Sequence, residues 1–134
     1  MYYMKHLFLF AFFLAAVNAY GQDQKINLIP QPVEMQVSSG YYILSKASTI
    51  CFDSKDSRIV ADMLAQKLNT PTGFSIRPQE GKSGSIQLNL NKTSVQQLGK
   101  EGYTLVSSSK GVVITANEPA GLFYGMQTLL QLLP

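Results

Sequence analysis

Few side chains in this sequence can attack a substrate, titrate near neutral pH or hold a metal. His6 is the only histidine and Cys51 the only cysteine. Zinc sites, Ser-His-Asp triads and Cys-His pairs all draw on histidine or on several thiolates. Because we expect His6 to be removed with the N-terminal segment described below, we predict neither a metal site nor a cofactor. Cys51 lies in the apolar run from Thr49 to Phe52, which favours a buried, inert thiol.

Carboxylates are the remaining candidates for acid–base chemistry. They are dispersed, and most fall at turns, at helix caps or on the solvent-facing side of a predicted strand or helix. Two carboxylates that converge in space could hydrolyse a glycoside, but no spacing supports such a pair. We therefore assign no catalytic residue among the eight, which are Asp23, Glu34, Asp53, Asp56, Asp62, Glu80, Glu101 and Glu118.

The charge and the aromatic residues bear on possible partners. The net charge is +3 and the positive residues are scattered, whereas nucleic-acid binding uses a clustered basic surface. Nucleic acid is therefore not an expected partner. A sugar could stack on aromatic rings, although core packing explains most of the candidates equally well, so glycans stay open as a partner. The candidates are Tyr41, Tyr42, Tyr103, Phe123 and Tyr124.

The first 22 residues have the features of a signal peptide. Lys5 and His6 precede an unbroken apolar run from Leu7 to Val17, and small residues precede Tyr20. The run is shorter than the roughly 20 residues that cross a bilayer. We expect cleavage close to Tyr20, a protein exported to the periplasm or beyond the cell, and no stable membrane anchor.

The remaining residues, 23–134, amount to one domain. They open with a strap, Leu28 to Pro32, in which two prolines hold their predecessors extended. Apolar and polar residues then alternate over Val33 to Val37, Ser38 to Gly40 can turn, and Tyr41 to Leu44 is rich in β-favouring residues. This pattern predicts a β-hairpin.

The middle of the chain mixes helix and strand signals. Apolar residues at helical spacing predict a helix from Ser57 to Asn69, which Pro71 should end because proline excludes its predecessor from helical geometry. A short strand is predicted at Thr49 to Phe52 and a brief one within Thr72 to Pro78. Ile86 to Leu90 alternates cleanly, as a half-buried strand does.

A second hairpin is predicted from Tyr103–Ser107 and Val112–Ala116, which flank a Ser-Ser-Lys-Gly turn. Lys92 to Lys100 is polar and has room for one helical turn. Together these elements predict an α+β fold, with one mostly antiparallel or mixed sheet of about five to seven strands and two helices packed on one face.

The last helix is predicted within Asn117 to Pro134. Asn117 can cap its N-terminus, Glu118 suits the helix dipole, and Pro119 needs no intrahelical donor. One apolar stripe should lie on the sheet; it consists of Leu122, Phe123, Met126, Leu129, Leu130 and Leu133.

A further stripe on this helix consists of Gly121, Gly125, Thr128 and Leu132. Glycine inside a helix costs about 1 kcal/mol relative to alanine, so the pair suggests that another backbone approaches closely. The partner is either the first helix or a domain that follows this one. We expect the second, and hence a role for this stripe in inter-domain packing.

Two stretches of the sequence resemble segments of a known protein family. Leu28–Pro32 with the hairpin around Gly40 resembles the opening of exported β-N-acetylhexosaminidases of glycoside hydrolase family 20. Glu101–Leu105, Val112–Ala116 and Ala120–Leu132 are similar to the end of that family's N-terminal domain. Related domains precede the barrels of α-glucuronidases and O-GlcNAc-removing hydrolases, but the proline motif favours family 20.

The resemblance implies that a catalytic (β/α)8 barrel follows this domain in the same polypeptide and removes terminal N-acetylhexosamine. In that family the substrate's own acetamido group attacks, an aspartate orients it and the adjacent glutamate is the general acid. This chain has no Asp-Glu dipeptide and ends at Pro134, so no catalytic residue carries over and the chain alone should be inactive. The other hypotheses are a free-standing glycan-binding or interaction module and a remnant of an interrupted gene.

Overall fold

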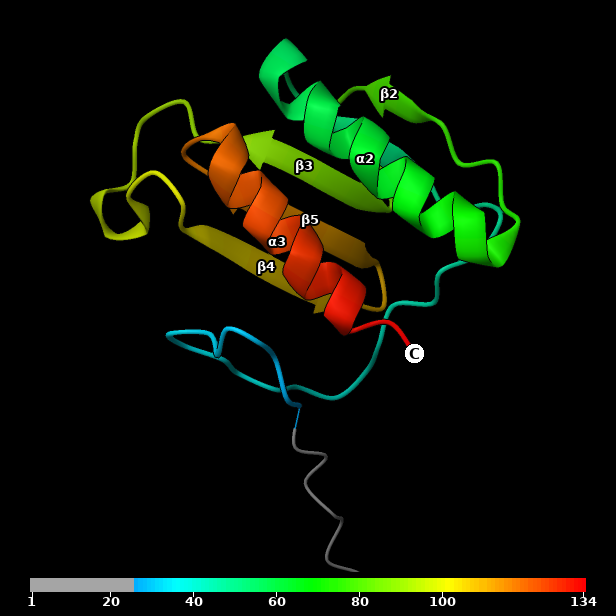
Figure 1. The fold of residues 1–134 in the computed structure, drawn as a ribbon, viewed down its shortest axis with the longest axis horizontal. Helices are drawn as coiled ribbons and strands as arrows, with labels where there is room; N and C mark the ends of the chain where they lie inside the picture. The colour runs from blue at the N-terminus through cyan, green and yellow to red at the C-terminus, as the bar shows by residue number, and fades with distance from the viewer. Residues whose placement is uncertain (1–25) are drawn as a thin grey trace, which may run out of the picture.

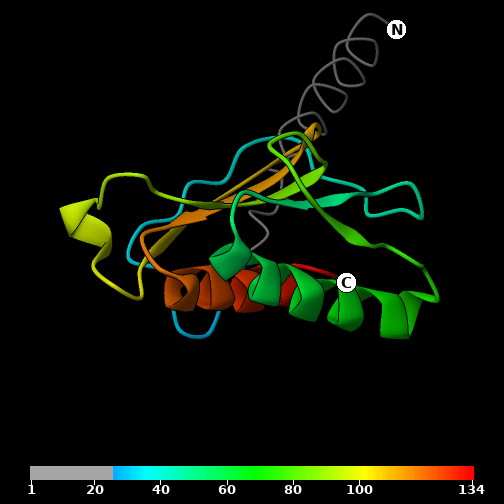
Figure 2. The same cartoon turned by 90° about the horizontal axis from the view of Figure 1, so that it is seen from above.

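A computed structural model describes residues 26–134, so the expected signal peptide lies outside the described residues. No helix in that range is long and apolar enough to span a bilayer. Two helices lie side by side on one face of a single sheet (Figures 1 and 2). The elements are β1 (Ile50–Phe52), α2 (Lys55–Thr72), β2 (Pro78–Glu80), β3 (Ile86–Leu90), the 3-10 turn η1 (Gln96–Leu98), β4 (Tyr103–Ser108), β5 (Gly111–Ala116) and α3 (Pro119–Gln131).

The sheet is mixed, with the strand order β2-β1-β3-β5-β4. The pairings β1–β2, β1–β3 and β3–β5 are parallel, and only β4–β5 is antiparallel. The predicted α+β class, the second hairpin and the two helices on one face are confirmed, and five strands lie within the expected number. Parallel pairing needs crossover connections, and α2 supplies the one between β1 and β2.

The core lies between the sheet and the helices. Ile86 and Leu88 on β3 are buried while Gln87 and Asn89 between them are partly exposed, as the alternation predicted. Burying each large aliphatic side chain contributes on the order of 1.5–3 kcal/mol. The other fully buried large side chains of the core are Ile50, Leu64, Val112, Ile114, Leu122 and Met126.

Helix α2 extends past both predicted ends. Ser54 caps its N-terminus, and the Ser54 and Ser57 side chains each accept a hydrogen bond from the other's backbone N–H. At the other end Pro71 lies inside the last turn and Gly73, with φ of +70°, terminates the helix by donating its N–H to the Asn69 carbonyl at 2.9 Å. The helix therefore ends at the glycine and continues through the proline.

The strand predicted within Thr72–Pro78 is displaced. Thr72 is still helical, and β2 begins only at Pro78. The Asn69 side chain holds the intervening segment, because its Nδ2 donates to the Ile76 carbonyl and its Oδ1 accepts from the Ile76 N–H, each at 2.9 Å. These two bonds satisfy the Ile76 backbone without strand pairing, and its side chain is buried in the core.

The first predicted hairpin is not formed. No residue between 26 and 49 belongs to a strand, and the one backbone–backbone hydrogen bond with both partners in residues 26–48 joins Ser48 to Ser45. An isolated two-stranded hairpin is marginal in water unless a hydrophobic face packs on something. Here Val33, Val37 and Ile43 are exposed, so that packing is missing. We call residues 33–43 the arm; it lies on the β4 side of the sheet (Figure 1).

Candidate docking surface at the C-terminal helix

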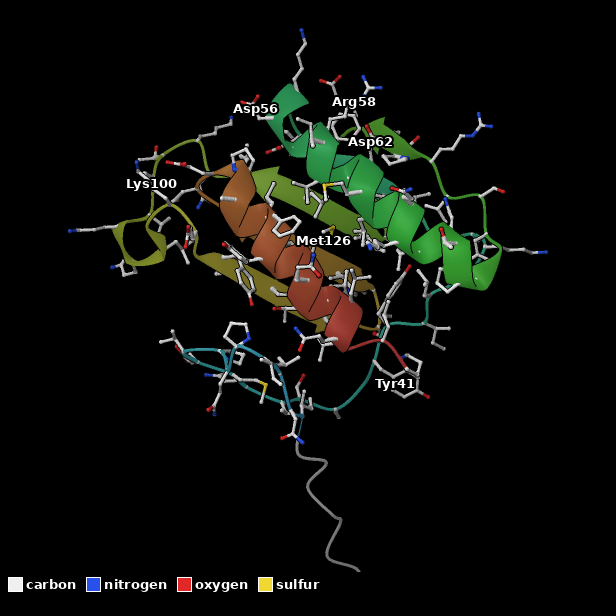
Figure 3. All side chains as sticks on the ribbon, in the orientation of Figure 1. Tyr41, Asp56, Arg58, Asp62, Lys100 and Met126 are labelled. Carbon is white, nitrogen blue, oxygen red and sulfur yellow. The ribbon has the colours of Figure 1, made fainter. Side chains whose placement is uncertain are left out.

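Some titratable side chains of residues 26–134 have clear structural contacts. Asp53 accepts hydrogen bonds from the Ser57 hydroxyl at 3.0 Å and from the Leu90 N–H at 2.9 Å, and so joins the start of α2 to β3. Arg58 and Asp62 form an exposed ion pair in the N-terminal half of α2, with 3.6 Å between the Arg58 Nε and the Asp62 carboxylate (Figure 3). No group of three His, Cys, Asp or Glu residues in this range could hold a metal ion.

Cys51 is buried, as predicted. Its thiol donates to the Ser83 carbonyl, with 3.3 Å between sulfur and oxygen. A sulfur enclosed in this way lacks the exposed, electropositive surroundings of reactive cysteines.

The start of α3 is organised differently from the prediction. Glu118 occupies the N-cap position and makes no side-chain cap, so the expectation that Asn117 caps the helix is wrong. The Asn117 amide instead donates to the carbonyls of Val95 and Gly99, at 2.8 and 2.7 Å, and its oxygen accepts from the N–H of Val95 at 2.8 Å and from Asn91 at 2.9 Å. Asn117 therefore fastens the loop around η1 to the beginning of the helix.

The main apolar stripe of α3 faces the core as expected. Leu122, Met126 and Leu129 are buried, and Figure 3 places Met126 on α3 over the sheet. The other three stripe members, Phe123, Leu130 and Leu133, are partly buried and pack against this core from its margin.

The glycine stripe also faces the sheet, which corrects the expectation of inter-domain packing. A Cβ on Gly121 would collide with the Gly102 carbonyl oxygen and lie 2.8 Å from the Ala116 Cβ, and a Cβ on Gly125 would lie 2.5 Å from the Ile114 Cγ2. The close backbone approach that these glycines indicated is real. Its partner is the β4–β5 side of the domain's own sheet.

The rest of this stripe follows the same arrangement in part. Thr128 is buried and its hydroxyl is hydrogen-bonded to the Tyr103 hydroxyl of β4. Leu132 lies past the last helical residue and is 37% exposed. Because α2 flanks α3 on one side and β4 and β5 lie beneath it, Gly121, Gly125 and Thr128 are used inside the domain, and an inter-domain role for Leu132 stays a prediction.

An open groove of about 400 Å³ runs between the strap and α3. Gln131 forms one end by clamping the strap: its Oε1 accepts from the Ile29 N–H and its Nε2 donates to the Ile29 carbonyl, each at 2.9 Å. The strap is thus fixed to the last turn of α3, but it bends at Ile29 and Pro30, which are joined by a cis peptide bond, and is not extended there as predicted. The residues that line the groove are Ile29, Pro30, Glu101, Tyr103, Tyr124, Gln127, Thr128 and Gln131.

The aromatic candidates for sugar stacking are not gathered together. Tyr103 and Tyr124 line the groove, whereas Tyr42 donates its hydroxyl to Ser48 at 2.5 Å. Phe123 packs edge-on against Tyr124 with 5.8 Å between ring centroids. Tyr41 is exposed on the arm, apart from both helices (Figure 3). A platform could use two rings at most, and the Tyr103 hydroxyl is already bonded to Thr128.

Comparison with known proteins identifies the domain. The family model described as "Glycosyl hydrolase family 20, domain 2" matches residues 25–134. The chain belongs to this family. A "Beta-hexosaminidase" of Porphyromonas gingivalis is 35% identical over 113 residues, which cover 84% of this chain and 14% of that protein.

Solved structures of family 20 enzymes share the fold. A mutant β-hexosaminidase of Streptomyces plicatus in complex with its product GlcNAc matches with a TM-score of 0.73 and 39% identity, over 78% of this chain and 21% of its own. The family 20 β-N-acetylhexosaminidase of Streptomyces coelicolor matches with a TM-score of 0.71 and 39% identity, over the same shares. In these enzymes the domain accompanies a catalytic barrel in one chain, so the likeness supports a non-catalytic accessory domain.

Proposed function

We propose that this chain is the non-catalytic N-terminal domain of an exported β-N-acetylhexosaminidase, which packs against and supports the catalytic (β/α)8 barrel of the same polypeptide. The observation that carries the proposal is the family 20 domain 2 match over residues 25–134, in a chain that spans 14% of its curated relative. The barrel would supply the catalytic residues and release terminal N-acetylhexosamine from glycans. This domain would pack against the barrel and support it.

The clamp between the strap and α3 suggests where the barrel would begin. Pro134 lies just beyond Gln131, whose side chain holds Ile29. A domain that continues from Pro134 would therefore start next to the groove, beside Tyr124 and Leu132, whose side chains are partly open to solvent. Partly exposed apolar and aromatic side chains next to an exit point suit an interface within one polypeptide.

The reading frame beyond the codon for Pro134 tests this proposal directly. We expect it to encode a (β/α)8 barrel with an adjacent Asp-Glu pair. A stop codon or an unrelated domain at that point would contradict the proposal.

Export is the second part of the proposal and rests on the sequence of residues 1–22 alone. N-terminal sequencing of material recovered outside the cytoplasm should find a chain that begins between Tyr20 and Asp23. Recovery of exported protein that retains Met1 would count against a cleaved signal peptide.

The groove favours one alternative, a free-standing glycan-binding module. Tyr103 and Tyr124 on its walls could contact a sugar ring. Titration with a chito-oligosaccharide, followed by NMR, distinguishes the two functions. Saturable shifts confined to the groove would favour the binding module, and no saturable response would favour the accessory domain.

A further inference from the structure

The arm, residues 33–43, is the one long segment of the described chain without backbone partners. We propose that it is a docking element that folds into a two-stranded hairpin against the domain that follows Pro134. This inference rests on the proposed function, because it requires that such a domain exists.

The backbone of the arm supplies the first argument. None of its N–H or carbonyl groups takes part in a backbone–backbone hydrogen bond. Buried peptide groups are almost always hydrogen-bonded. The peptide groups of the arm are therefore either bonded to water or free to pair with another part of the polypeptide. Gly40 has a φ of +102°, a conformation that suits the turn of a hairpin.

The side chains of the arm supply the second argument. Val33, Met35 and Val37 alternate with Glu34 and Gln36, so the three apolar side chains would share one face of a strand. Gln36 donates to Glu34 at 3.2 Å, which keeps the polar pair together. The exposed large apolar residues of the arm are Val33, Met35, Val37, Tyr41 and Ile43. If the first three lined one face of a strand, they would form a contiguous apolar patch, which is typical of an interaction surface.

The charge of the arm indicates the type of interface. Glu34 is its only charged residue. Interface cores are depleted in charge, and permanent interfaces are more apolar than transient ones. The arm therefore suits a constant neighbour in the same polypeptide better than an exchanging partner.

The position of the arm indicates which neighbour. The arm begins right after the strap, and Gln131 ties the strap to the last turn of α3. The last residue here is Pro134, and the relatives of known structure are about 3.7 times as long as this chain, since the match covers 78% of this chain and 21% of theirs. Whatever follows Pro134 is thus held near the root of the arm at high effective concentration, an advantage that a second copy of the chain lacks.

Hydrogen exchange measured by mass spectrometry tests the inference. Two proteins are compared: this chain, and the longer polypeptide that continues beyond Pro134. The arm amides should exchange at nearly unprotected rates in this chain and at least about tenfold more slowly in the longer polypeptide.

Three other results would overturn the inference in distinguishable ways. Protection of the arm in this chain alone would mean that it pairs with the free edge of β4 or with a second copy, which dilution would separate. If exchange in the arm were unchanged but exchange around Tyr124 were slower, the proposed function would stand and the docking role of the arm would be rejected. No change anywhere in the domain would reject both.

A matched pair of substitutions sharpens the test. Val37 on the arm is 66% exposed and Val106 on β4 is 62% exposed, so both should tolerate aspartate within the domain itself. In the longer polypeptide, Val37→Asp should remove the protection of the arm, whereas Val106→Asp should leave it intact. Equal effects of the two substitutions, or none from Val37→Asp, would contradict docking through the apolar face of the arm.

Discussion

Two hairpins were predicted from the same kind of pattern, and only one of them forms. Residues 103–116 became β4 and β5, whereas residues 33–44 remained without strand pairing. The difference lies in the neighbours. β5 pairs with β3 and is covered by α3, with Ile114 fully buried between them, while in the arm only Tyr42 packs against the core, and only in part. Alternation thus indicates which face of a strand is apolar, and a partner within the same chain decides whether the strand forms.

The largest effect is expected between one methionine on the helix that covers the formed hairpin and one on the arm. Met126 on α3 has no exposed surface and Met35 on the arm is 47% exposed. Met126→Asp buries an unpaired charge, which should cost about 4 kcal/mol or more and unfold the chain. Met35→Asp should leave the melting temperature within a few degrees of the wild type. Circular dichroism during heating measures both, and a stable Met126→Asp variant would mean that α3 does not pack as described.

An intermediate effect is expected at the glycine stripe. Gly125→Leu forces a side chain against Ile114 and the Tyr103 ring, so overpacking should lower the stability of this chain by about 1–3 kcal/mol. Ala120→Leu, on an exposed part of the same helix, is the control and should be nearly neutral. If Gly125→Leu left the denaturant midpoint unchanged, the close approach of α3 to the sheet would be refuted.

The smallest effect is expected at the contact between the strap, which precedes the arm, and the last turn of α3. Gln131→Ala removes both hydrogen bonds to Ile29 and should cost about 1 kcal/mol, mostly as local release of the strap. Gln36→Ala removes only a contact to Glu34 within the arm and should not matter. Limited proteolysis should cut the strap faster in Gln131→Ala alone. Equal cleavage of the two variants would show that the clamp does not hold the strap.

Local patterns in the sequence predicted the helices and strands better than they predicted which elements pack or pair with one another. The spacing from Leu122 to Leu129 and the alternation of Ile86 to Leu90 identified the core faces, because burial acts on each side chain in register with its element. The end of α2 was missed because Gly73, and not Pro71, terminates it. The parallel sheet order depends on long-range pairing that no local pattern carries.

The docking surface was predictable only in part. The glycine stripe correctly indicated a close backbone approach. Its partner was misassigned because the pattern does not specify direction. The groove depends on the hydrogen bonds between Ile29 and Gln131, which are 102 positions apart in the sequence. Only the folded structure reveals that contact.

The central claim, that this domain supports catalysis without performing it, is tested most directly by activity. Residues 23–134 alone and the polypeptide that continues beyond Pro134 are assayed side by side with a chromogenic N-acetylglucosaminide. The account predicts turnover by the longer polypeptide and none by the domain. Turnover by the domain that survived repurification, and that disappeared when one of its own carboxylates was replaced by the amide, would contradict it.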